Sequence, residues 1–280
     1  MSIPGALSVG DGRSVLVDRE GGVVQLVLNR TSKLNCLNFG VVSELRVALE
    51  QYQVDDTVRS IVISGAGEHF CAGGDLEEMR LARNDIVAYM DEMLDFFSFV
   101  EDCPKLVVAQ VDGYCLGGGF ELALACDIII ASDRALFGLP EPRFGLVPGF
   151  AIQRLPAMVG VTAASHLLFG RRFTPASVAQ NLGLTQHIVA PGELAATVRS
   201  VTDNVADLDP AAVATAKQAY RTYRRHAANL HHSAWANAAL FDRLSAEDAL
   251  DRLVPHSRPR DEAKPLNTPG KTMRSSRDVI

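Results

Sequence analysis

An α/β fold is predicted by three features of this sequence. Short runs of β-branched residues alternate with stretches of helical periodicity from Val15 to about Ser132. Glycine-rich turns directly follow two of these runs. The 280 residues, 48% hydrophobic and 21% charged, are enough to bury a sizeable core in one large domain or two smaller ones. Together these features indicate strands and helices that alternate along the chain and pack as layers.

Five apolar runs have the length and composition of strands, and each is bounded by Gly, Asp, Asn or Pro. The predicted strands are Val15–Val17, Val23–Leu28, Val58–Ser64, Leu106–Val111 and Ile128–Ala131. A short turn ending in Gly21 and Gly22 separates the first two, and paired glycines supply the positive φ of a tight hairpin. We therefore expect these two strands to form a hairpin.

Amphipathic helices are expected at Phe39–Tyr52 and Ile86–Val100, because apolar residues recur there every three or four positions. Beyond about residue 133 helical signals dominate. The further predicted helices are Thr162–Phe169, Glu193–Ala206, Ala211–Ala228 and Ala234–Leu253. Thr174 and Pro175 are interpreted as the cap and first residue of another short helix, which Gly183 closes.

This pattern divides the chain into three parts. Residues 1–205 are predicted to form the α/β core, 206–254 a helical region, and 255–280 a flexible tail rich in Pro, Arg and Ser. A solvated tail is favoured over an anion-binding arm. The basic and aromatic segment Tyr220–His226 is likewise expected to be a solvated helix face rather than an RNA contact.

Composition and missing motifs exclude several classes of protein. The net charge of −6 argues against a nucleic-acid partner. The sequence has no long uncharged apolar run that would indicate a membrane span or a signal peptide. Its five cysteines form no CxxC pair and are expected to stay reduced. A cytoplasmic protein is therefore predicted. Dinucleotide, P-loop and GxSxG motifs are absent, and His231 and His232 alone do not form a zinc site. We therefore expect neither a metal nor a cofactor.

The most unusual stretch is Gly113–Cys126, which follows a predicted strand and contains three consecutive glycines. Such a turn leaves backbone amides uncovered at a helix start, where the helix dipole favours negative charge. The amide of Gly118 is therefore a candidate anion binder, and Glu121 lies three residues further on, on roughly the same face. The alternative is a glutamate that only caps the start of its own helix.

A second glycine-rich turn, Ser64–Met79, follows another predicted strand. Asp75 and Glu78 mark a helix start, so the amide of Gly74 also lies beside a helix N-terminus. Ligands of open α/β sheets gather beyond the carboxyl ends of the strands, so the two turns can converge and their amides can bind one oxygen. Two ordinary turns without a ligand are the alternative.

The third candidate segment holds Glu141 between Pro140 and Pro142, which restrict the backbone on both sides. Gly149 follows shortly and offers one more uncovered amide before another helical run. Taken alone, a glutamate between prolines is more often a residue of a surface loop.

Four segments resemble motifs of the crotonase superfamily, the enoyl-CoA hydratase/isomerase family, over roughly residues 13–205. They are Leu28–Leu37, similar to NRP…NAL; Phe70–Leu76, similar to FxAGxDL; Asp112–Asp127, similar to NGxxxGGGxELALxCD; and Phe137–Glu141, similar to FGxPE. Each motif is weak alone, but the ordered set is highly specific. The resemblance implies a crotonase-type ββα superhelix that assembles as a trimer or a dimer of trimers, with C-terminal helices at the trimer contact.

The resemblance also implies a site for an acyl-CoA thioester. By position, the oxyanion hole falls on the amides of Gly74 and Gly118, the catalytic carboxylates on Glu121 and Glu141, and the water-holding amide on Gly149. The expected contacts to CoA are Arg30, Lys33, Leu34, Ala72, Asp75 and Leu76.

The implied reaction is the addition of water across the 2,3 double bond of a 2-enoyl-CoA. Negative charge builds on the thioester oxygen as an enolate forms, and two amides aimed at that oxygen lower the barrier. We expect Glu121 to orient the water as base and Glu141 to donate the α-carbon proton. A crotonase-fold isomerase, decarboxylase or C–C hydrolase, or a catalytically silent acyl-CoA-binding protein, is the alternative.

Two segments depart from the hydratase pattern. Phe150, Ala151 and Ile152 replace a glycine-rich run, and the side chains of Phe150 and Ile152 are expected to narrow the pocket beside the water or to reposition the water. Ala246–Leu253 stands in place of the motif EGxxAFxEKRxPxF. The shape of the acyl pocket is expected to depend on the packing of Met79, Met90, Met93, Phe97 and Phe120.

Overall fold

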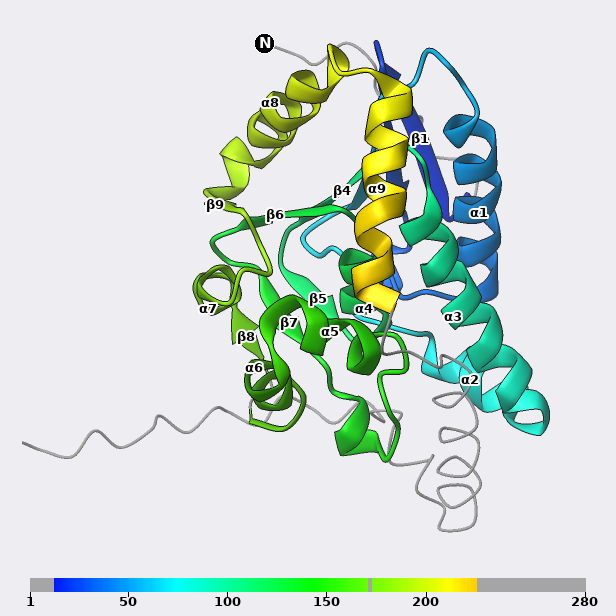
Figure 1. Cartoon of the computed structure of the whole chain (residues 1–280). Coiled ribbons are helices and arrows are strands. Elements are labelled where there is room, and N and C mark those ends of the chain that lie inside the picture. The colour runs from blue at the N-terminus through cyan, green and yellow to red at the C-terminus, as the bar shows by residue number, and fades with distance from the viewer. Residues whose placement is uncertain (1–12, 171–172, 226–280) are drawn as a thin grey trace, which may run out of the picture.

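The computed structural model describes residues 13–170 and 173–225, and its main sheet has six strands in the order β1-β2-β3-β4-β6-β9 (Figure 1). These are β1 Val15–Glu20, β2 Val23–Leu28, β3 Ser60–Gly65, β4 Leu106–Val111, β6 Ile128–Ser132 and β9 His187–Val189. The pair β1 and β2 is the expected antiparallel hairpin, and the other neighbours are parallel. All five predicted strands are confirmed with small shifts at their ends, whereas β9 has no counterpart among them.

A second, smaller sheet contains β5 Tyr114–Leu116, β7 Leu136–Gly138 and β8 Thr174–Pro175. The predicted short helix is present, but Thr174 and Pro175 are not its cap and first residue, because both pair with β7. Pro175 has an extended backbone, and α7 (Ala176–Asn181) begins one residue later. Proline is tolerated in such a short edge strand, where its missing N–H costs little.

Helices cover both faces of the main sheet, since side chains along a strand alternate between its two faces. Helices α1 (Phe39–Gln53) and α3 (Ile86–Asp102) lie side by side and belong to the larger core, which also includes Ile61 and Ile63 of β3 (Figure 1). The intervening Val62 faces the other way. It joins Val108, Ile130, Leu194 and Val198 in a separate cluster under α8 (Leu194–Ala206).

The remaining helices position the candidate site or lie near the C-terminal end of the described chain. They are α2 Leu76–Leu81, α4 Gly118–Ala125, α5 Ala151–Val159, α6 Val161–Ser165 and α9 Pro210–Arg225. A π-helical turn, His166–Gly170, continues α6, so the predicted helix Thr162–Phe169 is confirmed in outline.

Part of the predicted C-terminal organisation cannot be compared. The end of Ala211–Ala228, the helix Ala234–Leu253, His231 and His232, and the tail at 255–280 lie outside the described residues. Within the described part, none of the helices combines the length and the apolarity needed to cross a bilayer.

Candidate active site

The two glycine-rich turns pack against each other at the carboxyl ends of β3 and β4. The amide of Cys71 donates to the Tyr114 carbonyl at 2.9 Å, and the Leu116 amide donates back to the Cys71 carbonyl at 2.9 Å. A methyl group placed on Gly118 would lie 3.4 Å from the nitrogen of Gly74. The predicted convergence of the two turns is therefore confirmed.

This close approach requires glycine at particular positions. Gly117 has φ +51°, a conformation that side chains rarely adopt, and a methyl group there would meet Oε1 of Glu141 at 2.7 Å. A methyl group on Gly119 would lie only 2.5 Å from the Cys71 carbonyl oxygen. Gly119 therefore lets the two turns approach closely, and Gly117 leaves room for the carboxyl group of Glu141.

The amides of Gly74 and Gly118 are available for a ligand. Their chain neighbours are engaged, since the Asp75 amide donates to the Leu37 carbonyl at 2.7 Å and the Gly117 amide to the Gly138 carbonyl at 2.8 Å. Among the described residues, no acceptor receives a backbone hydrogen bond from Gly74 or Gly118. For Gly118 this follows from its place as the first residue of α4, where amides have no partner within the helix.

Both glycines line a cavity of about 70 Å³, which we name the inner cavity. Glu121, Glu141 and Gly149 line it as well, so all five predicted catalytic residues meet at one place. Its apolar wall includes Met79, Met90, Met93 and Phe97, as expected. Phe120 is the exception, because its ring is fully buried and packs on Phe137 with the centroids 5.3 Å apart.

The large side chains of Phe150 and Ile152, which follow Gly149, do not narrow this cavity. Phe150 is fully buried and packs against Phe97, with the ring centroids 5.5 Å apart. Neither Phe150 nor Ile152 is among the residues that line the inner cavity. The expectation of a pocket constricted by these side chains is therefore wrong.

Glu121 lies in the first turn of α4, but its carboxylate serves another helix. Its Oε1 accepts hydrogen bonds from the amides of Phe150 at 2.8 Å and Ala151 at 3.0 Å, at the start of α5. The alternative that it only caps its own helix is wrong. Burial raises the pKa of Glu121 to about 7, while the two amides act in the opposite direction by stabilising the charged form.

Glu141 begins the 3₁₀ helix η3 (Glu141–Phe144) and faces the same cavity, so it is not simply a residue of a surface loop. Its Oε2 is buried and has no hydrogen-bond partner within residues 13–170 and 173–225. Burial raises the pKa of Glu141 well above its usual range, and the negative charge of Glu121 raises it further. The two carboxyl groups thus differ in their surroundings: two amides bind Glu121, whereas burial and the charge of Glu121 favour the protonated form of Glu141.

A larger cleft of about 420 Å³, which we name the outer cleft, adjoins the inner cavity through shared lining residues Gly74, Met79 and Glu141. Five of the six residues expected to contact CoA line this cleft, namely Lys33, Leu34, Ala72, Asp75 and Leu76.

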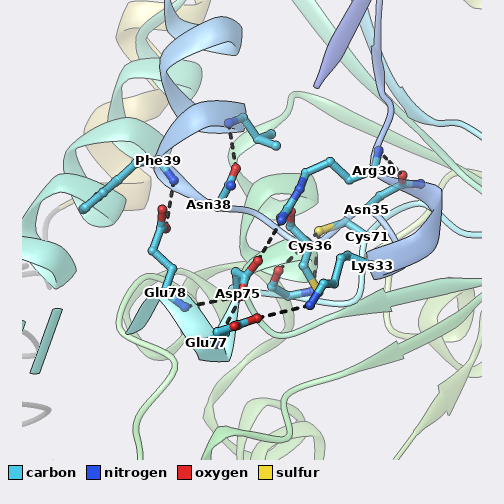
Figure 2. A network of polar contacts seen from close by, with 12 residues as sticks. Arg30, Lys33, Asn35, Cys36, Asn38, Phe39, Cys71, Asp75, Glu77 and Glu78 are labelled. Carbon is cyan, nitrogen blue, oxygen red and sulfur yellow. Dashed lines mark hydrogen bonds and ion pairs between the residues drawn. The ribbon is translucent and has the colours of Figure 1, made fainter. Parts of the chain in front are cut away.

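Arg30 has a different place from the other five. Its guanidinium donates to the Asp75 carboxylate at 2.9 Å and to the Cys36 carbonyl at 2.8 Å (Figure 2). Asp75 in turn accepts from the amides of Glu77 and Glu78 and caps α2. Arg30 therefore fixes the wall of the outer cleft to the start of α2.

Sequence reasoning missed Asn35, which shapes the loop beside the outer cleft. Leu34 and Asn35 both have positive φ, 49° and 58°, which is uncommon for residues other than glycine. The Asn35 side chain accepts from the Arg30 amide at 3.0 Å and donates to the His69 carbonyl at 2.7 Å. The tolerance of asparagine for this conformation is the signal that could have indicated its role.

The chain is similar to known proteins in sequence and in fold. The family model described as enoyl-CoA hydratase/isomerase matches residues 18–253. A short-chain-enoyl-CoA hydratase of Clostridium acetobutylicum is 37% identical over 210 residues, which cover 74% of this chain and 80% of that protein. A probable enoyl-CoA hydratase of Rhizobium meliloti is 36% identical over 207 residues, 74% of this chain and 80% of the relative.

Solved structures show the same relationship. The enoyl-CoA hydratase from Bacillus anthracis superimposes with a TM-score of 0.72 at 31% identity, covering 86% of this chain and 96% of that one. An enoyl-CoA hydratase/isomerase from Xanthobacter autotrophicus Py2 gives a TM-score of 0.75 at 28% identity, covering 85% and 95%. The chain has the crotonase fold, and it belongs to the enoyl-CoA hydratase/isomerase family of enzymes.

Proposed function

We propose that the protein adds water across the 2,3 double bond of short 2-enoyl-CoA thioesters. The observation that carries this proposal is the meeting of two glycine amides and two buried glutamates around one cavity. In the proposed complex, the amides of Gly74 and Gly118 donate to the thioester oxygen. Negative charge develops on that oxygen in the transition state, so donors fixed beforehand lower the barrier.

The two glutamates divide the acid and base work. Glu121, which two amides stabilise as an anion, takes a proton from water while the water oxygen bonds to C3. Glu141, held neutral by burial and by its charged neighbour, gives a proton to C2. The amide of Gly149, at the wall of the same cavity, holds the water. Proton exchange with solvent then restores both groups.

The outer cleft holds the CoA portion in this proposal. Lys33 supplies a cation for the CoA phosphates, and Leu34, Ala72 and Leu76 supply apolar contact. Asp75 and Arg30 act by fixing the cleft wall rather than by binding CoA directly. Hydration moves only water and protons, so the proposed reaction needs neither a metal nor a redox cofactor.

The inner cavity suits a short acyl group. Its volume of about 70 Å³ corresponds to roughly five water-sized spheres, enough for a few carbon atoms beyond the thioester. The Clostridium relative named as a short-chain-enoyl-CoA hydratase supports this choice. We also propose a cytoplasmic enzyme that assembles as a trimer or a dimer of trimers.

Hydration is tested with purified protein and crotonyl-CoA, by following the loss of the conjugated enoyl absorbance. Glu121→Gln and Glu141→Gln should each lower kcat by orders of magnitude, because each removes one half of the acid and base pair. Glu50→Gln, an exposed substitution on α1, is the matched control and should leave kcat unchanged.

Product analysis separates hydration from its alternatives. Accumulation of 3-hydroxybutanoyl-CoA supports the proposal. With 2-enoyl-CoAs longer than crotonyl-CoA, accumulation of a shifted double bond that depends on only one glutamate would identify an isomerase. Binding of acyl-CoAs without turnover of any of them would identify a silent binding protein.

A further inference from the structure

The inner cavity contains a polar group that the proposed reaction does not use. Tyr89, in the first turn of α3, is only 2% exposed and lines the cavity. Its hydroxyl has no hydrogen-bond partner in the described part of the chain. Buried hydroxyls in proteins are normally paired, because an unpaired one loses its hydrogen bonds to water without replacement. An unpaired hydroxyl at a cavity wall therefore points to a ligand.

The position of this hydroxyl places it beside the acyl group. It lies 3.9 Å from the point that a methyl group on Gly74 would occupy, and the terminal methyl of Met79 lies 3.7 Å from the same point. The ring of Tyr89 is fixed against Phe39, with the centroids 4.9 Å apart. Around it the wall is formed by the apolar side chains of Met90, Met93, Leu94 and Phe97.

The hydroxyl is a stable hydrogen-bond donor. Burial raises the pKa of Tyr89, and the nearby carboxylates of Glu78 and Asp75 raise it further. The group therefore keeps its proton at any working pH. The proposed reaction already assigns the amides of Gly74 and Gly118 to the thioester oxygen, so the Tyr89 hydroxyl at the wall of the same cavity remains for another oxygen of the ligand.

We propose that Tyr89 is a specificity-determining residue, whose hydroxyl donates a hydrogen bond to an oxygen carried by the acyl chain near its thioester end. This inference rests on the proposed function. A pure hydrocarbon chain would fill the cavity and leave the hydroxyl unpaired, whereas a chain with an ether, hydroxyl or carbonyl oxygen would pair with it. Sites built to hydrogen-bond a substrate group discriminate against analogues that lack the group.

A matched pair of substrates tests this selection. In 4-methoxycrotonyl-CoA an oxygen replaces one methylene of 2-hexenoyl-CoA, so the two acyl chains have the same length. We expect the ratio of kcat/KM for the methoxy substrate to that for 2-hexenoyl-CoA to fall about tenfold in Tyr89→Phe, the size of one net hydrogen bond. The ring is retained, and comparing the variant with wild type cancels any intrinsic difference in reactivity. Tyr52→Phe, which removes a hydroxyl from α1 outside the inner cavity, should leave the ratio unchanged.

Binding of the saturated thioesters gives a readout that does not depend on hydration. Calorimetry with 4-methoxybutanoyl-CoA and hexanoyl-CoA should show the same loss of preference in Tyr89→Phe. An unchanged ratio of dissociation constants, or an equal loss for both ligands, would overturn the inference. If wild type hydrates neither enoyl substrate but the binding preference changes as expected, the proposed function fails and the role of Tyr89 in ligand selection stands.

Discussion

At the scale of single residues, two carboxyl groups that share one cavity lie in different surroundings. Glu121 is bound by two amides and burial raises its pKa to about 7, while burial and the charge of Glu121 raise the pKa of Glu141 well above its usual range. A charged base and a neutral acid can therefore coexist near neutral pH.

This difference predicts a bell-shaped pH profile of kcat/KM for crotonyl-CoA. Activity should fall as the pH drops through about 7, because Glu121 gains a proton and no longer acts as base. It should fall again at high pH, because Glu141 loses the proton that it must donate. Steady-state rates between pH 5 and 10 measure the loss of activity at both ends of the profile. A value of kcat/KM that stays constant across that range would contradict the roles assigned to Glu121 and Glu141.

Alanine substitution of two adjacent glycines should have different effects, one on catalysis and the other on stability. A methyl group on Gly118 would fit at ordinary contact distance, 3.4 Å from the Gly74 nitrogen, and would cover the site proposed for the thioester oxygen. Gly118→Ala should therefore keep its Tm but lose about 10²–10³-fold in kcat. Gly119→Ala would meet the Cys71 carbonyl at 2.5 Å and should lose about 1–3 kcal/mol or more of unfolding free energy. Thermal unfolding and kinetics of both variants separate the two effects, and equal loss of stability would refute the distinction.

At the scale of elements, a buried ion pair joins the two helices beside the cavity. Arg154 of α5 donates to Glu101 of α3 through Nε at 3.1 Å and through an η nitrogen at 2.9 Å. Both side chains are only 1% exposed. The same α5 supplies the amide of Ala151 to Glu121, so the pair stabilises the element that positions the base.

Removing one partner of this ion pair should lower the free energy of unfolding far more than removing both partners. Arg154→Met leaves a buried carboxylate without its guanidinium and should cost about 3–5 kcal/mol of unfolding free energy. The double variant Arg154→Met, Glu101→Leu should recover most of that loss, because no buried charge remains. Urea denaturation of the two variants gives both values. Additive losses in the double variant would show that the pair is not coupled.

The long elements could be predicted from the sequence, whereas the short ones could not. Leu106–Val111 is a continuous apolar run of strand length, and Phe39–Gln53 shows the periodicity of an amphipathic helix. The two- and three-residue strands of the smaller sheet are too short for any period, so Thr174 and Pro175 looked like a helix start. The directions of Phe120 and Phe150 are set by their packing partners Phe137 and Phe97, which no local pattern indicates.

At the scale of the whole molecule, the site is assembled from segments far apart in the chain. The parallel order of β2, β3 and β4 brings the turns after β3 and β4 to one edge of the main sheet. The positions of the two turns after strands predicted that the amides of Gly74 and Gly118 could meet, and the family resemblance implied the same pair, but neither gave the strand order that produces the meeting. Asn35 lies in the segment similar to NRP…NAL but had no predicted role, and Tyr89 lies outside all four motifs, so only the folded chain shows what their side chains contact.

The most direct test is the infrared carbonyl band of butyryl-CoA labelled with ¹³C at C1, a saturated thioester that cannot be hydrated. When it is bound to the wild-type protein, two amide donors on one oxygen should lower the stretching frequency below its value in water. Gly118→Ala should return the band toward the solution value, because the added methyl group covers the Gly74 amide. A band at the solution frequency in the bound wild-type complex would contradict an oxyanion hole formed by Gly74 and Gly118.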